Sequence, residues 1–331
     1  MLRRALRPVM AGEAGAVRLP ERVTYSLRAA GEAGDRWLAA LPDLLAGLET
    51  DWSITVGGAL AGGNAAYVAE ATRADGSPVV LKVALPAISG FSPFGQELRT
   101  LRMADGDPYV ALLRFDPSRQ AMLLERLGEP LGRLGWPVPQ QLDALVHTVA
   151  RGWRPIPAAT LPDPDALPDG AAKARWLADF VVSGWEELSR PCPEATVAEA
   201  ARCAAARAAA LDASQSVLVH GDAHPFNLLQ ASDGSFRLID PEGLASEPAH
   251  DLGVILRDFN DDLLTKDPRI ATAIARGRCR RAGELARIDP EAIWEWAFAE
   301  RVSTGLFLQS LGHEREAETF LAVATKLSGA S

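Results

Sequence analysis

Two aspartates, Asp222 and Asp240, each follow a short apolar run and carry the clearest chemical signal in the chain. Asp222 comes soon after the run Val217–Val219, and Asp240 ends the run 236–240, eighteen positions later. Phosphoryl transfer needs one carboxylate to receive a hydroxyl proton and separate oxygen ligands to hold Mg²⁺ against the phosphates. A pair of acids at the ends of two predicted strands suits that chemistry.

Asn227 adds a third oxygen donor to the pair, five residues after Asp222. Pro225 prevents a helix from beginning before it, and Gly221 allows a sharp turn, so a compact loop can bring Asn227 close to Asp222. The sequence 232–234, Ser-Asp-Gly, predicts a hairpin turn that pairs the flanking apolar runs. The three oxygen ligands are therefore expected at one end of a hairpin.

Lys82 lies within a second apolar strand pattern, 78–85, and is one of only four lysines among 34 basic residues. A buried ammonium is costly unless it is paired or meets an anion. Glu97 falls fifteen residues later on a predicted amphipathic helix and is the expected partner. Glu70 and Glu125 are alternative partners, and a lysine whose head simply reaches water is a further interpretation.

The loop 220–227, which reads HGDAHPFN, resembles the HGDxHxxN loop of aminoglycoside phosphotransferases, and 238–240 resembles their metal-binding strand end. The resemblance implies that Asp222 is the catalytic base and that Asn227 and Asp240 bind Mg²⁺. It also implies that His220 and Asp251 brace the loop. The alternative interpretation is that the two aspartates merely cap a hairpin.

Within that superfamily, four segments are similar to the streptomycin 6-kinase and hydroxyurea kinase branch: 37–42, 73–82, 122–127 and 239–243. The resemblance implies an α+β, two-lobed protein-kinase-like fold with a small antiparallel sheet lobe bearing one helix and a large, mainly helical lobe. We expect an N-terminal helical extension at 1–50, a nucleotide-binding lobe at 51–127, and a catalytic and substrate-binding lobe at 128–331.

The resemblance also assigns nucleotide-binding roles in the first lobe. Lys82, held by Glu97, would contact the α- and β-phosphates of ATP. Gly58 and Gly62 lie in a glycine-rich hairpin whose main-chain amides can approach phosphate, although such a hairpin is also a common plain turn. Main-chain groups near Glu125 and Leu127 would pair with the adenine edge, where the alternative is an ordinary core strand.

Helical patterns fill much of the remaining chain. The segment around Pro42 has a buried apolar face, and the proline is expected to start or interrupt its helix. Further helices are predicted at 140–151, 171–189, 194–211, 248–264, 268–286 and 290–327. Glu242 and Asp258 are candidate contacts for a cationic substrate, although acids at such positions often form a solvated face.

Composition narrows the class of protein. The chain has 331 residues, 48% hydrophobic content and a net charge of −9. These values indicate a globular protein and argue against nucleic-acid or anionic-membrane partners. Three cysteines with no metal or disulfide spacing, and no apolar segment of signal-peptide or membrane-spanning length, predict a cytoplasmic protein.

The expected function is ATP-dependent phosphorylation of a small-molecule hydroxyl, with Mg²⁺ and with a cationic aminoglycoside of streptomycin type as the acceptor. A metabolic kinase acting on choline, homoserine or a fructosamine would share these motifs. A non-catalytic nucleotide-binding regulatory protein is the alternative from a different class, but it would not need a proton acceptor at Asp222.

Overall fold

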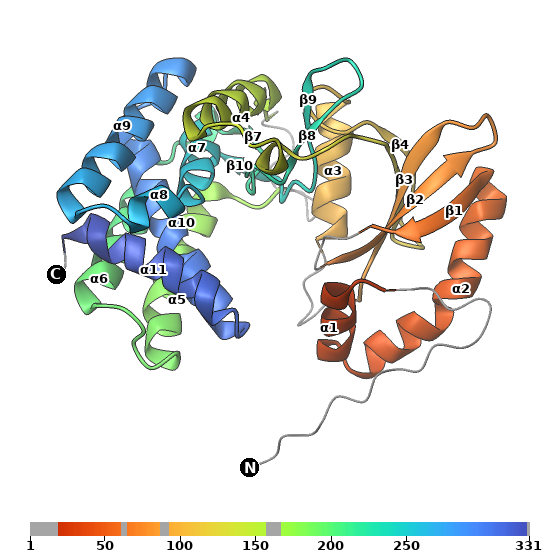
Figure 1. The fold of residues 1–331 in the computed structure, drawn as a ribbon, viewed down its shortest axis with the longest axis horizontal. Helices are drawn as coiled ribbons and strands as arrows, with labels where there is room; N and C mark the ends of the chain where they lie inside the picture. The colour runs from red at the N-terminus through yellow and green to blue at the C-terminus, as the bar shows by residue number, and fades with distance from the viewer. Residues whose placement is uncertain (1–18, 61–64, 87–92, 157–166, 330–331) are drawn as a thin grey trace, which may run out of the picture. The chain divides into compact units, whose positions relative to one another are not determined.

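The computed structural model describes residues 19–60, 65–86, 93–156 and 167–329 (Figure 1). Contacts within the chain divide it into two compact units. The first unit runs to Gly95 and also contains Leu112–Arg126; the second comprises Gln96–Ala111 and the chain from Leu127 onward. The expected functional division at 1–50, 51–127 and 128–331 stays a prediction.

A five-stranded antiparallel sheet forms the centre of the first unit, with the strand order β1-β2-β3-β5-β4. The turn at Gly76, with φ +82°, joins β2 to β3. The register places Lys82 of β3 between Val68 and Met122 on the neighbouring strands. The strands are β1 Ile54–Ala59, β2 Ala66–Arg73, β3 Pro78–Ala84, β4 Leu112–Asp116 and β5 Ala121–Glu125.

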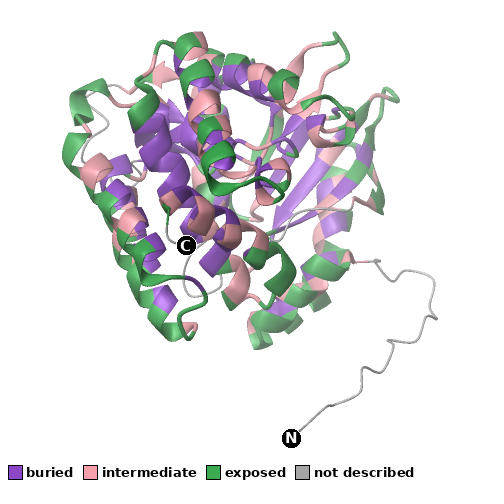
Figure 2. Cartoon of the chain, turned by 60° about the vertical axis from the view of Figure 1, so that its left-hand side comes forward, coloured by how far each residue is buried: buried purple, intermediate pink, exposed green. Residues whose placement is uncertain are grey.

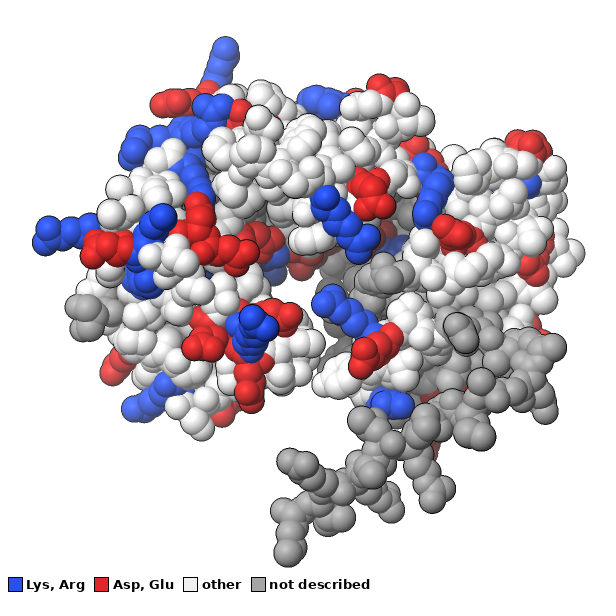
Figure 3. All heavy atoms as spheres, viewed as in Figure 1, with Lys and Arg blue, Asp and Glu red and all other residues white. Residues whose placement is uncertain are grey.

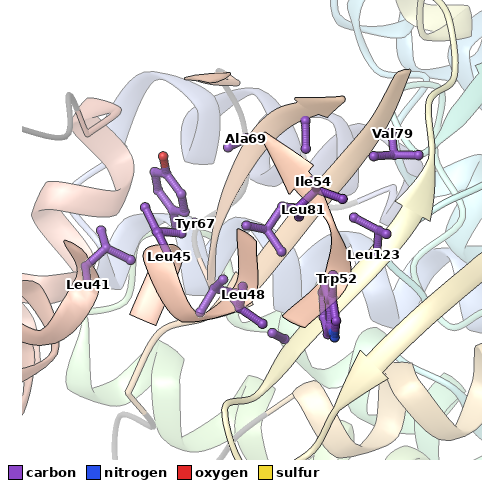
Figure 4. Close-up of a cluster of buried hydrophobic side chains, with 13 residues drawn as sticks. Leu41, Leu45, Leu48, Trp52, Ile54, Tyr67, Ala69, Val79, Leu81 and Leu123 are labelled. Atoms are coloured by element: carbon purple, nitrogen blue, oxygen red, sulfur yellow. The ribbon is translucent and has the colours of Figure 1, made fainter. Parts of the chain in front are cut away.

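Helices α1 (Glu21–Ala29) and α2 (Glu32–Trp52) precede the sheet, and α2 packs along one of its faces. Leu41, Leu45 and Leu48 recur at helical spacing and meet alternate residues of the strands in one apolar core (Figure 4). Val79, Leu81 and Val83 of β3 belong to this core. Because strand side chains alternate, Lys82 projects to the opposite face of the sheet.

Pro42 neither starts nor interrupts the helix, contrary to the prediction, since α2 runs through it. Proline removes the hydrogen bond that the carbonyl four residues earlier would accept. Pro42 and Leu38 both lie on the exposed side of α2, where water can satisfy that carbonyl. The apolar face toward the sheet is unaffected, and the helix therefore tolerates the proline.

The second unit is mainly helical, and α10 contributes more buried residues than any other of its helices. Trp296 and Phe298 of α10 are almost completely inaccessible, and α10 packs against α5, α6, α7, α9 and α11. Figure 2 shows buried segments inside this unit and exposed residues on the outer faces of its helices. The helices are α3 Phe94–Ala104, α4 Val138–Gly152, α5 Gly170–Glu187, α6 Glu194–Ala210, α7 Pro248–Arg257, α8 Asp261–Leu264, α9 Pro268–Ala286, α10 Pro290–Ser310 and α11 Glu314–Ser328.

Two predicted helices are each divided in the structure. The segment 248–264 forms α7 and α8, because the Asn260 side-chain amide donates to the main-chain carbonyl of Arg257 at 2.7 Å and caps the end of α7. The segment 290–327 forms α10 and α11, separated at Gly312, whose φ of +79° ends the helical path. Apolar periodicity continued across both breaks and concealed them.

Short strands in the second unit flank the turns that contain Asp222, Asn227 and Asp240. The predicted hairpin is confirmed as β8 (Leu228–Gln230) paired with β9 (Phe236–Leu238). Strand β7 (Val217–Val219) lies between β10 (Leu244–Ser246) and β6 (Arg154–Pro155). The three cysteines are buried free thiols, and no helix in the described residues is both long and apolar enough to cross a bilayer.

Candidate active site

Asp251 fixes the loop that begins where β7 ends. Its two carboxylate oxygens accept hydrogen bonds from the main-chain amides of His220, at 3.0 Å, and Gly221, at 2.9 Å. The indole Nε1 of Trp153 donates to the same carboxylate at 2.9 Å. Asp251 is fully buried on α7, so these three donors take the place of water around its charge. The carboxylate of Asp251 on α7 thereby holds the main chain just before Asp222.

Gly221 adopts a left-handed backbone conformation, which other residues adopt only with strain. Its φ is +83°, and a Cβ atom at this position would lie 2.4 Å from a methyl carbon of Leu244 and 3.0 Å from Cβ of Glu242. Glycine avoids both the backbone strain and the clash. The chain can therefore turn tightly between the buried His220 and the half-buried Asp222.

His220 ties the loop to the strand that leads to Asp240. Its Nδ1 accepts from the main-chain amide of Asp222 at 3.1 Å, and its Nε2 lies 2.9 Å from the carbonyl of Ile239, to which it must donate. The ring stacks on Tyr109 with a centroid separation of 5.8 Å. Burial lowers the pKa of His220, against the opposing effect of Asp251 and Asp222, so the neutral ring with the proton on Nε2 fits both bonds.

Asn227 lies beside Asp222, as the sequence of the loop predicted. Its side-chain nitrogen donates to the main-chain carbonyl of Asp222 at 3.0 Å and lies 3.4 Å from Asp222 Oδ2. Its main-chain carbonyl accepts from the amide of Ile239 at 3.0 Å. Because the amide nitrogen is used within the loop, the side-chain oxygen of Asn227 is the atom that can serve a cation.

Asp240 directly follows Ile239, whose main-chain amide donates to the carbonyl of Asn227. Its φ is +56°, which turns the chain out of the strand. Gly243 closes the turn by donating to the carbonyl of His220 at 3.0 Å, and it approaches α3 so closely that a Cβ there would meet Thr100 Oγ1 at 1.8 Å. Only glycine fits at that contact.

The donors at this end of the hairpin fit Mg²⁺. Mg²⁺ prefers oxygen, and it usually takes only one or two protein carboxylates while phosphates and water complete its coordination. Asn227 offers an amide oxygen, and Asp240, which follows the partner of Asn227 on the other strand, offers a carboxylate. Among the described residues there is no cluster of three or more His, Cys, Asp or Glu side chains suited to a metal.

Arg257 contacts Asp222 and was not anticipated from the sequence. Its Nη2 makes a short ion pair with Asp222 Oδ1, while His224 Nε2 lies 3.6 Å from Oδ2. Arg257 ends α7, six residues after Asp251. No local pattern in the sequence links Arg257 to Asp222, from which it is separated by 35 residues.

The two candidate substrate acids are paired with cations of their own unit. Glu242 lies 3.5 Å from Lys173 Nζ, and Asp258 lies 3.5 Å from Arg257 Nε. The Glu242 side chain is about half exposed, whereas that of Asp258 is mostly covered. Glu242 is next to the candidate catalytic loop, residues 220–227. Its carboxylate is 3.5 Å from the position that a Cβ atom on Gly221 would occupy.

The candidate nucleotide-binding residues are distributed over both units. Lys82, Gly58 and Glu125 belong to the first unit, on β3, β1 and the end of β5. Glu97, a buried residue of α3, and the buried Leu127 belong to the second. Gly62 lies outside the described residues.

Glu70 is occupied by a different cation from the one considered in the sequence. It lies 3.1 Å from Arg126 within the first unit, and both side chains are substantially exposed. Lys82, by contrast, is buried to 9% exposure on the strand β3. The identity of the carboxylate that partners Lys82 stays a prediction. In the face shown in Figure 3, acidic and basic side chains are interspersed over the second unit.

Comparisons with known proteins identify the family of the chain. A sequence profile of the aminoglycoside/hydroxyurea antibiotic resistance kinase family matches residues 51–312. A streptomycin 6-kinase of Streptomyces glaucescens is 30% identical over 300 residues, covering 88% of this chain and 91% of that protein. A hydroxyurea phosphotransferase of Kitasatospora aureofaciens is 30% identical over 286 residues, covering 83% and 79%.

A solved structure shows the same fold at low sequence identity. The ethanolamine kinase of Plasmodium vivax superimposes with a TM-score of 0.56 and 13% identity, covering 90% of this chain and 89% of that one. The expected α+β, protein-kinase-like fold, with an antiparallel sheet lobe and a mainly helical lobe, is confirmed. The chain belongs to the aminoglycoside/hydroxyurea antibiotic resistance kinase family and is a phosphotransferase with an alcohol group as acceptor.

Proposed function

We propose that this chain transfers the γ-phosphoryl group of ATP to a hydroxyl of an aminoglycoside of streptomycin type. The observation that carries the proposal is the loop geometry: one carboxylate, Asp222, is held beside an amide, Asn227, and Asp240 follows Ile239, which bonds to Asn227 through the main chain. The 30% identity to a streptomycin 6-kinase over most of both chains supports the choice of acceptor.

Asp222 is the proposed catalytic base. The acceptor hydroxyl gives its proton to an Asp222 carboxylate oxygen as the hydroxyl oxygen bonds to the γ-phosphorus. The bond between that phosphorus and the oxygen bridging to the β-phosphate breaks at the same time, and ADP leaves with the electron pair. The side chains of Asp251 and His220 accept hydrogen bonds from main-chain amides of the loop and hold it in place, so Asp222 does not need to be ordered during the reaction.

Asn227 and Asp240 are the proposed ligands for Mg²⁺, and Lys82 the proposed contact for the α- and β-phosphates, with Glu97 as the partner that orients the lysine. When bound, Mg²⁺ neutralises charge that develops on the β- and γ-phosphate oxygens. Gly58, Glu125 and Leu127 remain proposed nucleotide contacts through their main chain.

Glu242 and Asp258 are the proposed contacts for the cationic part of the acceptor. The net charge of −9 favours a cationic small molecule, and we place the enzyme in the cytoplasm, where ATP is available. A second acceptor, hydroxyurea, is favoured by one specific observation, the 30% identity to a hydroxyurea phosphotransferase. Choline, homoserine and fructosamines remain alternative acceptors.

The decisive experiment is a kinase assay with ATP and Mg²⁺ across streptomycin, hydroxyurea and choline, with mass spectrometry of the products. We expect streptomycin to gain the mass of one phosphate, and Asp222→Asn to lower kcat by about 10³-fold while leaving the thermal unfolding temperature near that of the wild type. The matched control is Asp233→Asn, which changes an exposed acid at the tip of the same hairpin.

Near-normal turnover by Asp222→Asn would refute the base assignment. Phosphorylation of hydroxyurea or choline in place of streptomycin would refute the acceptor while keeping the reaction type.

A further inference from the structure

We propose that Arg257 is a positioning residue for the phosphoryl transfer, acting through Asp222. This inference rests on the proposed role of Asp222 as the base. Arg257 Nη2 donates a charge-assisted hydrogen bond to Asp222 Oδ1. Asp222 Oδ2 is left facing Asn227 and His224, with longer separations of 3.4 Å and 3.6 Å. Oδ2 is therefore the oxygen with capacity to receive the hydroxyl proton.

Arg257 can hold Asp222 because it is itself held. Its Nη1 lies 3.4 Å from Glu300 Oε2 and its Nε lies 3.5 Å from Asp258 Oδ1. The guanidinium thus faces three carboxylates while its side chain is only 13% exposed. Burial opposes its charge, but Asp222, Asp258 and Glu300 raise the pKa of Arg257, so it stays cationic and does not compete for the transferred proton.

Glu300 anchors this arrangement from α10. Its other oxygen, Oε1, lies 3.3 Å from His250 Nε2, and its side chain is 4% exposed. Burial by itself would raise the pKa of Glu300, but Lys173, the hydrogen bond of His250 and the charge of Arg257 lower it to about 2. Glu300 is therefore charged throughout the working range of pH and gives Arg257 a fixed counter-charge.

Helix α7 therefore contacts the loop 220–227 at two points. Asp251 in its first turn binds the main-chain amides before Asp222, and Arg257 at its last residue binds the Asp222 side chain. The first contact fixes the path of the backbone. The second restricts the rotation of the carboxylate, which the backbone contacts leave free.

A competing interpretation gives Arg257 the opposite effect. If the acceptor's cation took the place of Arg257 at Asp222, the ion pair would block the free enzyme, and its removal would raise turnover. The buried ties of Arg257 to Glu300 and Asp258 favour positioning over displacement, because a guanidinium that left Asp222 would also strain or lose those contacts.

The test compares Arg257→Met with a control arginine of equal burial, Arg207→Met. Arg207 is 14% exposed, pairs with the buried Glu295 of α10 at 2.7 Å and with Glu247 at 3.4 Å, and has no contact with the catalytic loop among the described residues. Both variants take one arginine from a buried glutamate that keeps another cationic neighbour, Arg202 for Glu295 and Lys173 for Glu300, so both should lower Tm by similar amounts. We expect only Arg257→Met to lower kcat, by about 100-fold, with KM for ATP unchanged.

Two further readouts separate positioning from general structure. Arg257→Lys should recover part of kcat, and guanidinium ion at concentrations far below denaturing ones should raise the kcat of Arg257→Met without affecting Arg207→Met. A crystal structure of Arg257→Met should show the Asp222 carboxylate in a changed or multiple orientation.

The inference is overturned if Arg257→Met keeps the kcat of Arg207→Met, exceeds that of the wild type, or leaves Asp222 in place. A wild type that phosphorylates no acceptor would instead refute the proposed function; the Asp222 orientation in the Arg257→Met crystal would then decide the positioning claim alone.

Discussion

The sheet of the first unit and the catalytic loop of the second are stabilised in different ways. The sheet meets α2 through an apolar core to which thirteen buried residues contribute (Figure 4). The loop from His220 to Asn227 is held by a few directed polar bonds, chiefly to Asp251 and His220. Apolar packing is non-directional and distributed, whereas a buried hydrogen bond fixes one group in one orientation.

This difference suggests how each region should respond to substitution. Loss of one apolar side chain from the sheet core should cost stability and leave the remaining geometry nearly intact. Loss of one acceptor under the loop should leave several donors unsatisfied together and should also disorder Asp222. Stability and activity are therefore expected to separate in the first region and to fall together in the second.

The largest effect is expected for Asp251→Ala. The substitution leaves the amides of His220 and Gly221 and the indole N–H of Trp153 without their acceptor in a buried place. At about 1–3 kcal/mol for each unsatisfied group, we expect a loss of about 3–5 kcal/mol in the free energy of unfolding. The surviving folded enzyme should lose at least about 100-fold in kcat, because the loop no longer orients Asp222.

Urea unfolding and steady-state kinetics of Asp251→Ala measure both effects. The control is Asp212→Ala. It removes an exposed carboxylate that accepts a hydrogen bond from the main-chain amide of Ser214, shortly before β7. Wild-type kcat in the folded fraction of Asp251→Ala would contradict the view that this one carboxylate determines the loop.

Leu48→Ala should show the opposite pattern in the sheet unit. Leu48 is fully buried in the core between α2 and the sheet. We expect a loss of about 2–5 kcal/mol in unfolding free energy from the lost burial and the cavity. We expect kcat per folded molecule within about two-fold of wild type, since the other core contacts preserve the sheet.

Leu38→Ala is the control on the same helix, where the side chain is 42% exposed and its removal should change stability by less than about 0.5 kcal/mol. A large drop in kcat for folded Leu48→Ala would show that the sheet is not over-determined, and the contrast between the two regions would fail.

The contrast also explains what could be predicted from the sequence. The hairpin β8–β9 and helix α9 follow from local signals, namely a Ser-Asp-Gly turn and a proline at the first helical position, and both are found as predicted. The end of α7 was missed because the apolar pattern continues past Asn260, whose cap becomes evident only when its side chain is seen on the Arg257 carbonyl.

Arg257 could not be assigned from local pattern at all. Its contact with Asp222 spans 35 residues, and its contact with Glu300 spans 43. Charged pairs of this kind are set by how helices pack, and the sequence records no periodicity for them. The prediction for Pro42 failed although it followed a local rule. A proline usually ends or interrupts a helix, but at this exposed position water can satisfy the carbonyl that loses its hydrogen bond.

A smaller effect, dependent on pH, is expected from the buried charges beneath the loop. Glu300 faces Lys173 of α5 and His250 and Arg257 of α7, and its pKa falls from the ordinary 4.5 to about 2 despite burial. A folded-state pKa below the unfolded value stabilises the protein above the unfolded pKa, and this stabilisation is lost as pH falls toward the folded pKa. The stability advantage of wild type over Glu300→Gln should shrink by about 2 kcal/mol between pH 6 and pH 3.

Urea unfolding of both proteins at each pH gives that difference directly. Glu295→Gln, a buried glutamate of the same helix that pairs with Arg207, shows how much of the change belongs to any such pair. A stability gap between wild type and Glu300→Gln that stays constant with pH would mean that Glu300 titrates normally and does not serve as a fixed charge.

The smallest effect is expected for Glu70→Gln, in the sheet unit. Glu70 pairs at 3.1 Å with Arg126, and the two side chains are 56% and 35% exposed. Exposed ion pairs contribute about 0–1 kcal/mol, so unfolding free energy should change by less than about 1 kcal/mol. Turnover should stay within about two-fold of wild type, and KM for ATP should not move. A rise of ten-fold or more in KM for ATP would instead identify Glu70 as the carboxylate that serves Lys82, and would mean that the sheet also contains a polar contact on which function depends.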